Sequence, residues 1–386
     1  MPPRARRSTA DLSPVCRVAA SPLVRRNRRW LVRHLLPVWV AAGMLAGGCG
    51  FPALTRAEVP ASVAAPGPVL SNAPRLQGKK GPRQSQLGDY LRPRGFAALP
   101  LRTNAGPHLE ITAQINGVSG RFLLDTGAQI TVVNTTSLKK FRLSSVKTGV
   151  RVYGAIGGPG ERIGAALASR LKLGPCEFSP FLLGVSNLSA LNQGRSVKQG
   201  SGPFDGIIGT DVLQNFSFVI DCAGLKLYAR PSDSARSLPP GGLNAYLETY
   251  GYNEVPLKRS SISDFEVLAK VNGRDALWLV DTGAAITLLD VSVSRKAGIK
   301  LHRTPYSVGG AGGGRQQIAV GIVDTLRLHK LQVRGAPIAV SDISSAGGTG
   351  PQEPGRPPID GYLGADFLRE KRAIIDCARM KLYLRN

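Results

Sequence analysis

Histidine and cysteine are scarce in this chain of 386 residues, which contains four of the former and five of the latter. The histidines lie far apart and show no spacing typical of two ligands to one metal ion. No pattern for a nucleotide or redox cofactor is present either. We therefore expect neither a metal site nor a cofactor. The four histidines are His34, His108, His302 and His329.

Long apolar segments are also missing, and the one near the N-terminus is short. It runs from Leu35 to Leu45, whereas a membrane-spanning helix needs roughly 20 residues. An arginine cluster precedes it, and the small residues Ala46-Gly47-Gly48 follow it. A basic region, a short apolar region and small residues at a cleavage point are typical of an export signal. Residues 1–48 are therefore predicted to be a signal peptide.

Cys49 directly follows these small residues and resembles the lipidated cysteine of bacterial lipoproteins, with Ala46 at the position that leucine usually occupies. The resemblance implies a lipid on Cys49 that anchors the exported chain to a membrane of the cell envelope, facing the periplasm. A plain signal peptide or an uncleaved anchor is the alternative, and Arg28-Arg29 also suggests a twin-arginine signal.

Acidic residues are few, at 25 against 50 basic ones, and the formal net charge is +25 at pH 7. Such a charge favours anionic surfaces, for example lipid headgroups. The basic residues are scattered and form no recognised nucleic-acid motif. We therefore expect a solvated basic surface and no nucleic-acid partner.

The stretch between the predicted signal and the first regular pattern is rich in proline, alanine and glycine, with no persistent period of a helix or strand. This composition is typical of a flexible segment. We predict that residues 49–96 are a tether that holds a folded region away from the membrane. A pro-segment that masks the active site is the alternative.

The four residues Asp-Thr-Gly-Ala occur twice, at Asp125–Ala128 and at Asp281–Ala284. Each copy follows one apolar run and precedes another, which predicts two strands joined by a tight turn that the glycine permits. The turn holds a carboxylate at the end of a buried strand, where a lone anion is costly. Two such carboxylates, 156 residues apart, suggest a pair that meets in the folded chain.

The repeat extends well beyond these turns. Each copy has an alternating hairpin with an Asn-Gly turn before the aspartate, at Asn116-Gly117 and Asn272-Gly273. Each also has two apolar residues followed by a glycine, Gly209 or Gly364, which lie 84 and 83 residues after their aspartates. The pattern predicts two homologous lobes, residues 97–230 and 253–386, joined by a linker of residues 231–252.

A glycine-rich segment lies between predicted strands in each copy, downstream of the aspartate. Glycines at such a place suit the tip of a mobile hairpin that closes over a substrate. A phosphate-binding loop is the competing interpretation, but no helical pattern follows either segment. The candidate flap residues are Ile156, Gly157, Gly158, Gly310, Ala311 and Gly312.

This ordered set of motifs resembles the retropepsin-type aspartic proteases, in particular the bacterial retropepsin-like proteins, over residues 97–386. The resemblance implies an all-β fold of two closed β-barrel lobes with short helices, fused in one chain so that a monomer suffices. It further implies an endopeptidase that cleaves a polypeptide substrate with a catalytic dyad of Asp125 and Asp281.

The resemblance also assigns roles to the residues that follow each aspartate. Thr126 and Thr282 would hydrogen-bond across the axis that relates the lobes and lock the two turns together. Gly127 and Gly283 would keep the turns tight and offer backbone contacts to the shared carboxylates.

Two carboxylates that meet at one axis cannot both ionise easily and would share a proton. One can then take a proton from water while the other protonates the scissile carbonyl. Alanine follows both glycines, whereas pepsins commonly carry a hydroxyl there that stabilises the ionised carboxylate. We therefore expect raised pKa values and activity at mildly acidic to near-neutral pH. The alternative is an inactive envelope lipoprotein that binds peptides in the same cleft.

Two further pairs are equivalent under the repeat. Asp211 and Asp366 lie where helices are predicted to begin, so we expect them to cap those helices. Cys222 and Cys377 would pair in an oxidising compartment if they lay close together, and free thiols are an equal alternative.

Overall fold

The computed structural model describes residues 84–103, 106–152, 161–193, 195, 202–231, 242–259, 265–310, 315–343 and 357–385, together with two short strands, β1 (Arg17–Val18) and β2 (Leu45–Ala46). The rest of the predicted signal peptide, Cys49 and the predicted tether up to residue 83 lie outside these residues.

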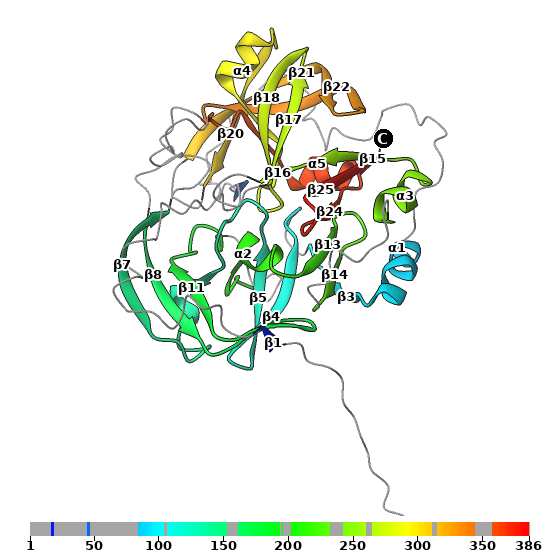
Figure 1. Cartoon of the computed structure of the whole chain (residues 1–386). Coiled ribbons are helices and arrows are strands. Elements are labelled where there is room, and N and C mark those ends of the chain that lie inside the picture. Colours follow the sequence, from blue (N-terminus) through cyan, green and yellow to red (C-terminus); the bar gives the residue numbers. More distant parts are fainter. Residues whose placement is uncertain are drawn as a thin grey trace, which may run out of the picture.

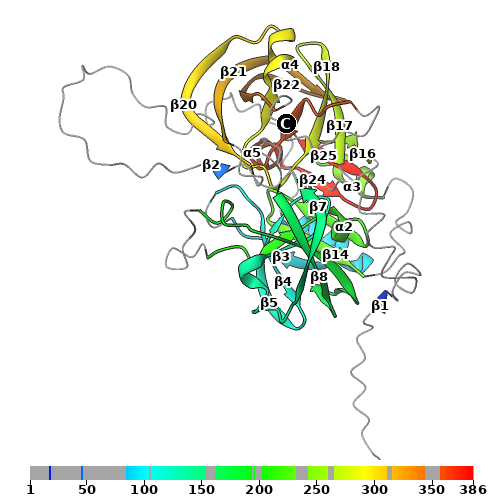
Figure 2. The ribbon, with the colours of Figure 1, turned by 90° about the vertical axis from the view of Figure 1, so that its left-hand side faces the viewer.

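The chain folds into two β lobes with a third sheet between them (Figure 1). Figure 2 shows the two lobes one above the other, with β7 and β8 on the lower one and β20 and β21 on the upper one. Short helices cover parts of each lobe. This arrangement confirms the predicted all-β, two-lobe fold.

Lobe 1 is built on a sheet with the order β1-β10-β9-β4-β5-β12-β6-β11-β8-β7. β8 lies near one end of this order, and β9, which follows it directly in the chain, pairs with β4 near the other end. This connection brings the two ends of the sheet together and curls it into a barrel. Its strands are β4 (Glu110–Ile115), β5 (Val118–Leu124), β6 (Val132–Asn134), β7 (Ser145–Val152), β8 (Glu161–Ala168), β9 (Leu171–Leu173), β10 (Cys176–Phe178), β11 (Phe181–Ser186) and β12 (Gly206–Ile208), with helices η3 (Thr135–Ser137) and α2 (Thr210–Leu213).

Lobe 2 repeats this plan with the order β16-β17-β18-β23-β19-β22-β21-β20-β2. Here one long strand, β21, pairs with both β20 and β17 and closes the barrel. Its elements are β16 (Lys258–Arg259), β17 (Phe265–Val271), β18 (Arg274–Val280), β19 (Leu288–Asp290), α4 (Val291–Lys296), β20 (Leu301–Gly309), β21 (Arg315–Leu328), β22 (Leu331–Ser341), β23 (Gly361–Leu363) and α5 (Ala365–Glu370).

The hairpin before each aspartate turns where the sequence predicts. Asn116 and Gly117 have φ angles of 51° and 82°, and Asn272 and Gly273 have φ angles of 47° and 85°. Positive φ at both central residues is the requirement of the tight hairpin turn that Asn-Gly favours. The following strands, β5 and β18, carry the apolar runs into the core and end directly before the aspartates.

A short apolar strand lies beside the aspartate-bearing strand in each lobe. β12 pairs in parallel with β5 and in antiparallel with β6, and β23 does the same with β18 and β19. This strand carries the two apolar residues of the downstream motif, so the glycine that follows it, Gly209 or Gly364, lies next to the Asp-Thr-Gly turn.

The central sheet has a symmetrical order, β15-β25-β24-β13-β14-β3, in which each half comes from one lobe. Its middle pair, β13 and β24, is antiparallel, with Ile220 opposite its repeat equivalent Ile375. The pseudo-twofold axis therefore passes through this pair. The strands are β3 (Ala97–Pro100), β13 (Ser217–Asp221), β14 (Lys226–Arg230), β15 (Tyr252–Pro256), β24 (Ile374–Asp376) and β25 (Lys381–Arg385).

Helices pack on the outer face of this sheet, where the sequence predicts a tether and a linker. Helices α1 (Gln84–Leu91), η2 (Arg92–Arg94) and α3 (Gly242–Glu248) lie there (Figure 1). Leu87 and Leu91 of α1 and Leu247 of α3 join the sheet in one apolar cluster. The prediction of a flexible tether to residue 96 is therefore wrong for its last turns, because their apolar side chains are buried against the sheet.

In the described part of the chain, every helix is too short or too polar to cross a membrane.

Candidate active site

The two aspartates of the repeat lie at the ends of equivalent strands, close to the axis between the lobes. Asp125 follows β5, and its backbone N–H donates to the carbonyl of Ile208 at 3.0 Å. Asp281 follows β18, and its N–H donates to Leu363 in the same way, also at 3.0 Å. Both carboxyls are fully buried, at 0% and 1% exposure. The short strands β12 and β23 thus fix the backbone of the aspartates.

The two threonines tie the turns together across the axis. The Thr126 N–H donates to Oγ1 of Thr282 at 3.0 Å, and the Thr282 N–H donates to Oγ1 of Thr126 at 3.0 Å. Each hydroxyl then donates onward to the opposite lobe, Thr126 to the Val280 carbonyl at 2.6 Å and Thr282 to the Leu124 carbonyl at 2.7 Å. Four buried hydrogen bonds therefore join the lobes directly beneath the carboxyls.

The glycine of each turn leaves room for the carboxyl of the opposite lobe. A Cβ on Gly283 would lie 2.3–2.5 Å from the Asp125 carboxyl, and one on Gly127 would lie 2.7–2.8 Å from that of Asp281. Such contacts are closer than any side-chain carbon tolerates. Each carboxyl therefore lies over the glycine of the other lobe, and the two aspartates are held face to face.

Backbone donors hold the inner oxygen of each carboxyl. Asp125 Oδ1 accepts hydrogen bonds from Gly127 N at 2.8 Å and Ala128 N at 3.2 Å. Asp281 Oδ1 accepts from Gly283 N at 2.8 Å and Ala284 N at 2.9 Å. The repeat thus supplies two nearly identical cradles, in which main-chain groups orient both carboxyls without any hydroxyl at the alanine positions.

Burial raises the pKa of Asp125 well above its ordinary value, and the neighbouring Asp281 carboxyl raises it further. The backbone donors of Gly127 and Ala128 act in the opposite direction but do not overcome these effects. Asp125 Oδ2 is buried and accepts no hydrogen bond from a backbone or hydroxyl donor. Two buried carboxyls this close together cannot both ionise easily.

In each lobe, one further threonine and one further aspartate hydrogen-bond near the Asp-Thr-Gly turn. The hydroxyl of Thr131 accepts from Gly209 N at 3.1 Å and donates to Asp211 Oδ1 at 2.7 Å. Thr287 does the same with Gly364 at 3.0 Å and Asp366 at 2.7 Å. The sequence did not single out these threonines, although their identical place after each apolar isoleucine was a detectable signal.

The prediction that Asp211 and Asp366 cap helices is confirmed in part, because each carboxyl accepts a hydrogen bond from an N–H of the first turn, that of Val212 at 2.8 Å and that of Phe367 at 2.7 Å. The N-cap positions of α2 and α5 belong to Gly209 and Gly364, which have no side chain to accept a hydrogen bond. Asp211 and Asp366 lie inside the first turn, where their carboxyls bind the hydroxyls of Thr131 and Thr287. Each carboxyl therefore also links its helix to the loop after the Asp-Thr-Gly turn.

The predicted flaps lie only partly within the described residues. Hairpins β7–β8 and β20–β21 lead to them, and both have the same irregularity in register. In each, a threonine hydroxyl bonds across the hairpin, Thr148 to the Ile163 carbonyl and Thr304 to the Ile318 carbonyl. Gly310 is buried just after β20. Five flap candidates lie outside the described residues: Ile156, Gly157, Gly158, Ala311 and Gly312.

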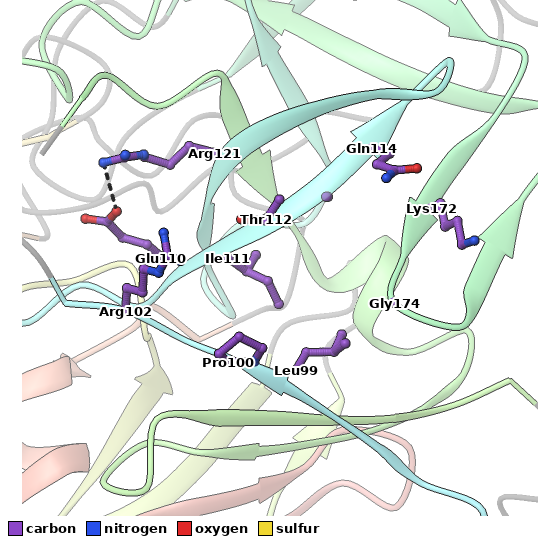
Figure 3. Close-up of a pocket in the computed structure, with 11 residues that line it drawn as sticks. Leu99, Pro100, Arg102, Glu110, Ile111, Thr112, Gln114, Arg121, Lys172 and Gly174 are labelled. Atoms are coloured by element: carbon purple, nitrogen blue, oxygen red, sulfur yellow. Dashed lines mark hydrogen bonds and ion pairs between the residues drawn. The ribbon is translucent and has the colours of Figure 1, made fainter. Parts of the chain in front are cut away.

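A cavity of about 280 Å³ lies beside the outer face of β4, between β3 and the β9–β10 turn. Figure 3 shows Arg121 and Glu110 at one end of it and Gln114 and Lys172 at the other. Arg121 Nη1 lies 3.5 Å from Glu110 Oε2. The cavity contains neither aspartate of the candidate dyad, so it is separate from the candidate active site.

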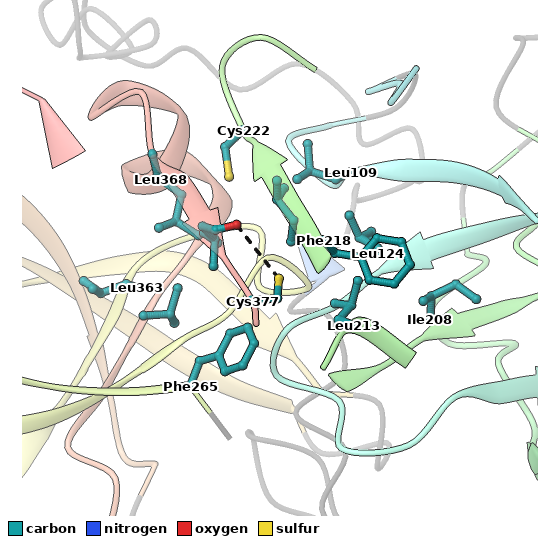
Figure 4. Packing of buried hydrophobic residues seen from close by; sticks show 14 of the residues in the cluster. Leu109, Leu124, Ile208, Leu213, Phe218, Cys222, Phe265, Leu363, Leu368 and Cys377 are labelled. Carbon is teal, nitrogen blue, oxygen red and sulfur yellow. Dashed lines mark hydrogen bonds between the residues drawn. The ribbon is translucent and has the colours of Figure 1, made fainter. Parts of the chain in front are cut away.

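Cys222 and Cys377 belong to one buried apolar cluster that includes residues of both lobes, as Figure 4 shows. Both are buried free thiols. In the register of β13 and β24 they are four positions apart, about 13 Å along the strands, whereas a disulfide spans roughly 7 Å at most between Cα atoms. Burial also raises the pKa of both thiols. The free-thiol alternative therefore describes this structure.

Nowhere in the residues that the structure describes do three or more histidine, cysteine or acidic side chains gather as metal ligands would. The buried polar groups at the axis are carboxyls, hydroxyls and backbone amides, most of which hydrogen-bond to one another.

The comparisons with known proteins agree with this geometry. Residues 111–212 and residues 267–367 each match the sequence model of a family described as aspartyl protease, and each match falls inside one lobe. Among curated proteins, no sequence matches the chain.

Two solved structures show similarity at low identity. Basic 7S globulin from soybean is 13% identical, with 75% of this chain and 95% of that chain covered and a TM-score of 0.37. A retropepsin-like aspartic protease from Rickettsia conorii is 20% identical, with 35% of this chain and 89% of that chain covered and a TM-score of 0.24.

Proposed function

Because this chain belongs to the aspartyl protease family, we propose that it is an aspartic endopeptidase whose Asp125 and Asp281 together activate water. The observation that supports this most strongly is the pairing of the two buried carboxyls. Each lies over the glycine of the other lobe, and burial and mutual repulsion raise the pKa of Asp125.

The shared proton gives the two carboxyls different roles in one step. The ionised carboxyl takes a proton from a water molecule as that water attacks the scissile carbonyl carbon. The protonated carboxyl donates its proton to the carbonyl oxygen, so no charge builds up on the tetrahedral intermediate. The intermediate then collapses and the C–N bond breaks. The leaving amine receives a proton from the protonated carboxyl, while a hydroxyl of the intermediate returns its proton to the ionised carboxyl as the new C=O bond forms. The proton count of the pair is the same at the end as at the start.

Both cradles favour this exchange of roles. The oxygens held by backbone amides stay in place, at 2.8–3.2 Å from their donors. The threonine hydrogen bonds across the axis prevent the two turns from separating. A rigid pair in a site of low polarity needs little reorganisation during the reaction, which lowers the barrier.

Export and anchoring belong to the same proposal. The basic and apolar segment before Cys49 supports secretion into a cell envelope, and the cysteine supports a lipid anchor there. The fused lobes supply both halves of the dyad from one chain, which supports a monomer acting on polypeptides. The expected substrate is an extended peptide, as the resemblance to retropepsin-type proteases implies.

A peptide-library cleavage profile between pH 3 and 8 tests the proposal, with Asp125→Asn and Asp281→Asn as variants. The wild type should cleave, and each variant should lose at least about 100-fold in kcat/KM because one of the two proton-transfer roles is gone. Binding of a statine-containing peptide, which mimics the tetrahedral intermediate, reports whether the cleft is intact. Binding without cleavage at any pH would favour the peptide-binding lipoprotein instead.

A further inference from the structure

One buried histidine in lobe 1 reaches the catalytic turn of lobe 2. His108 lies just before β4 and is 7% exposed. Its ring makes a hydrogen bond with the backbone of Gly283. The Gly283 N–H already donates to Asp281 Oδ1, so the backbone group that remains for the ring is the carbonyl oxygen. The ring N–H therefore donates from one lobe to the turn of the other.

A fixed positive charge lies beside this histidine. Arg195 Nη2 is 2.6 Å from Glu110 Oε1, and its Nε donates to the Gly202 carbonyl at 3.1 Å. Its guanidinium lies 3.8 Å from the ring centroid of Phe204. With 6% of its side chain exposed, Arg195 has little freedom to move away. Burial and Arg195 together lower the pKa of His108 from 6.5 to about 4, although the Gly283 hydrogen bond opposes this shift.

The surroundings of His108 disfavour the protonated form of its ring. The Nε2 atom is buried and has no hydrogen-bond partner. The charged group that acts on the ring is Arg195, whose partner Glu110 also faces Arg121. The Asp281 carboxyl lies beyond the ring's partner Gly283 and accepts a hydrogen bond from its N–H. Glu110 already faces two arginines, so its charge is compensated. A charged imidazole would be repelled by Arg195 and would lie in an apolar site.

We propose that neutral His108 is a positioning residue that holds the Gly283 turn, and that protonation of His108 displaces this turn and weakens catalysis at low pH. Gly283 lies against the Asp125 carboxyl, where even an added Cβ has no room. A shift of the turn therefore moves the dyad directly. This proposal rests on the proposed protease activity and adds a limit to it on the acid side.

The pH profile of kcat/KM in the full-length wild type, His108→Gln and His108→Ala tests the role. At pH 3, one unit below the pKa, about ten in eleven copies of His108 carry the proton. Between pH 5 and pH 3 the wild type should therefore lose roughly tenfold more activity than His108→Gln, whose amide keeps a donor but does not titrate. At pH 6, His108→Ala should lower kcat and leave KM nearly unchanged, and His108→Gln should restore part of kcat.

The matched control is His302→Gln, because His302 is exposed at the base of β20. It should leave the profile unchanged. Parallel acid limbs in the wild type and His108→Gln, or an unchanged kcat in His108→Ala, would overturn the proposal. A loss of equal size at every pH in both variants would do the same, since it would show only a structural role.

An NMR titration of the wild type separates this inference from the protease activity. The His108 ring should titrate with a midpoint near 4, and the Gly283 amide signal should shift with the same midpoint. If no peptide is cleaved at any pH but the two midpoints coincide, the protease proposal fails and the coupling stands. If the ring titrates without any change at Gly283, the positioning role is wrong whatever the activity.

Discussion

The two lobes are alike where they touch the dyad and differ beyond it. Around Asp125 and Asp281, equivalent hydrogen bonds differ by 0.3 Å or less, from the backbone amides to the threonine hydroxyls. One step further out, lobe 1 places His108 against the other turn, whereas the aligned residue of lobe 2 is Asp264. The repeat therefore preserves the hydrogen bonds that hold the two aspartates, while the residues one step further out differ between the lobes.

Substitution of Gly127 or Gly283 should have the largest effect on activity. Gly283→Ala and Gly127→Ala each place a methyl group into the opposite carboxyl, at 2.3–2.5 Å and 2.7–2.8 Å. Displacing a catalytic group by about 1 Å costs on the order of 100-fold, so both should lose at least that much kcat/KM, and Gly283→Ala should lose more.

Gly149→Ala is the control for these glycine variants, because open space surrounds that position. It should retain the activity of the wild type. Equal activity of Gly283→Ala and the control would show that the turn adjusts freely, against the close approach described above.

The threonines test whether the lobes share their stability equally. Thr126→Val and Thr282→Val each leave one carbonyl and one amide of the other lobe buried without a partner, at a cost of about 2–4 kcal/mol in the free energy of unfolding. Urea unfolding at pH 6 should give similar losses for both, and the double variant should lose less than the sum, because the two hydroxyls share one network. Thr112→Val on the exposed face of β4 is the control. Clearly unequal single losses would contradict the symmetry.

His108 should give the lobes different sensitivity to acid. Its pKa is about 4 in the folded chain and 6.5 ordinarily, so below pH 6.5 the unfolded chain binds a proton that the folded chain cannot. The free energy of unfolding therefore falls as the pH drops from 6.5 to 4. Below pH 4, His108 contributes no further change. At about 1.4 kcal/mol per pKa unit the loss is roughly 3 kcal/mol.

Buried aspartates with raised pKa values act in the opposite direction, since they bind protons more readily when folded. The measurement is therefore the difference in unfolding free energy between the wild type and His108→Gln at pH 6.5 and pH 4. As the pH falls from 6.5 to 4, the wild type should lose more stability than His108→Gln. Any stability advantage of the wild type should therefore shrink, or the variant should become the more stable of the two. A constant difference would show that His108 has an ordinary pKa.

The cysteines should have the smallest effect. Cys222 and Cys377 are free in the structure, so a reducing agent should change the free energy of unfolding by no more than about 0.5 kcal/mol, the size of a neutral change. Mass measurement after alkylation of the unfolded chain should find both thiols reactive. A mass that shows a bridge between them would contradict the register of β13 and β24.

The sequence predicted much of this molecule because the repeat presents each signal twice. The Asp-Thr-Gly-Ala turns, the Asn-Gly hairpins and the apolar-apolar-Gly motifs all lie where the spacing indicates, and the structure brings Asp125 and Asp281 together. Local turn chemistry determines these features, so a chain read in isolation reveals them.

The features that the sequence did not predict depend on distant contacts. Helix α1 lies in a segment of loop-like composition, and it is held by packing, with Tyr90 stacked on Tyr246 of α3 at 4.2 Å. The carboxyl of Asp211 binds Thr131, which is 80 residues away. The repeat aligns His108 with Asp264 and not with a second histidine, so the pattern did not point to it. Such contacts arise from the tertiary fold, which overrides local preference.

The most direct test of the paired dyad compares kcat/KM of Asp125→Asn, Asp281→Asn and the double variant with the wild type at pH 5. If the two carboxyls act as one unit, each single variant should lose nearly as much as the double variant, because the remaining carboxyl has no partner with which to share the proton. Losses that multiply, or a single variant that keeps more than about a tenth of the activity, would contradict a shared proton.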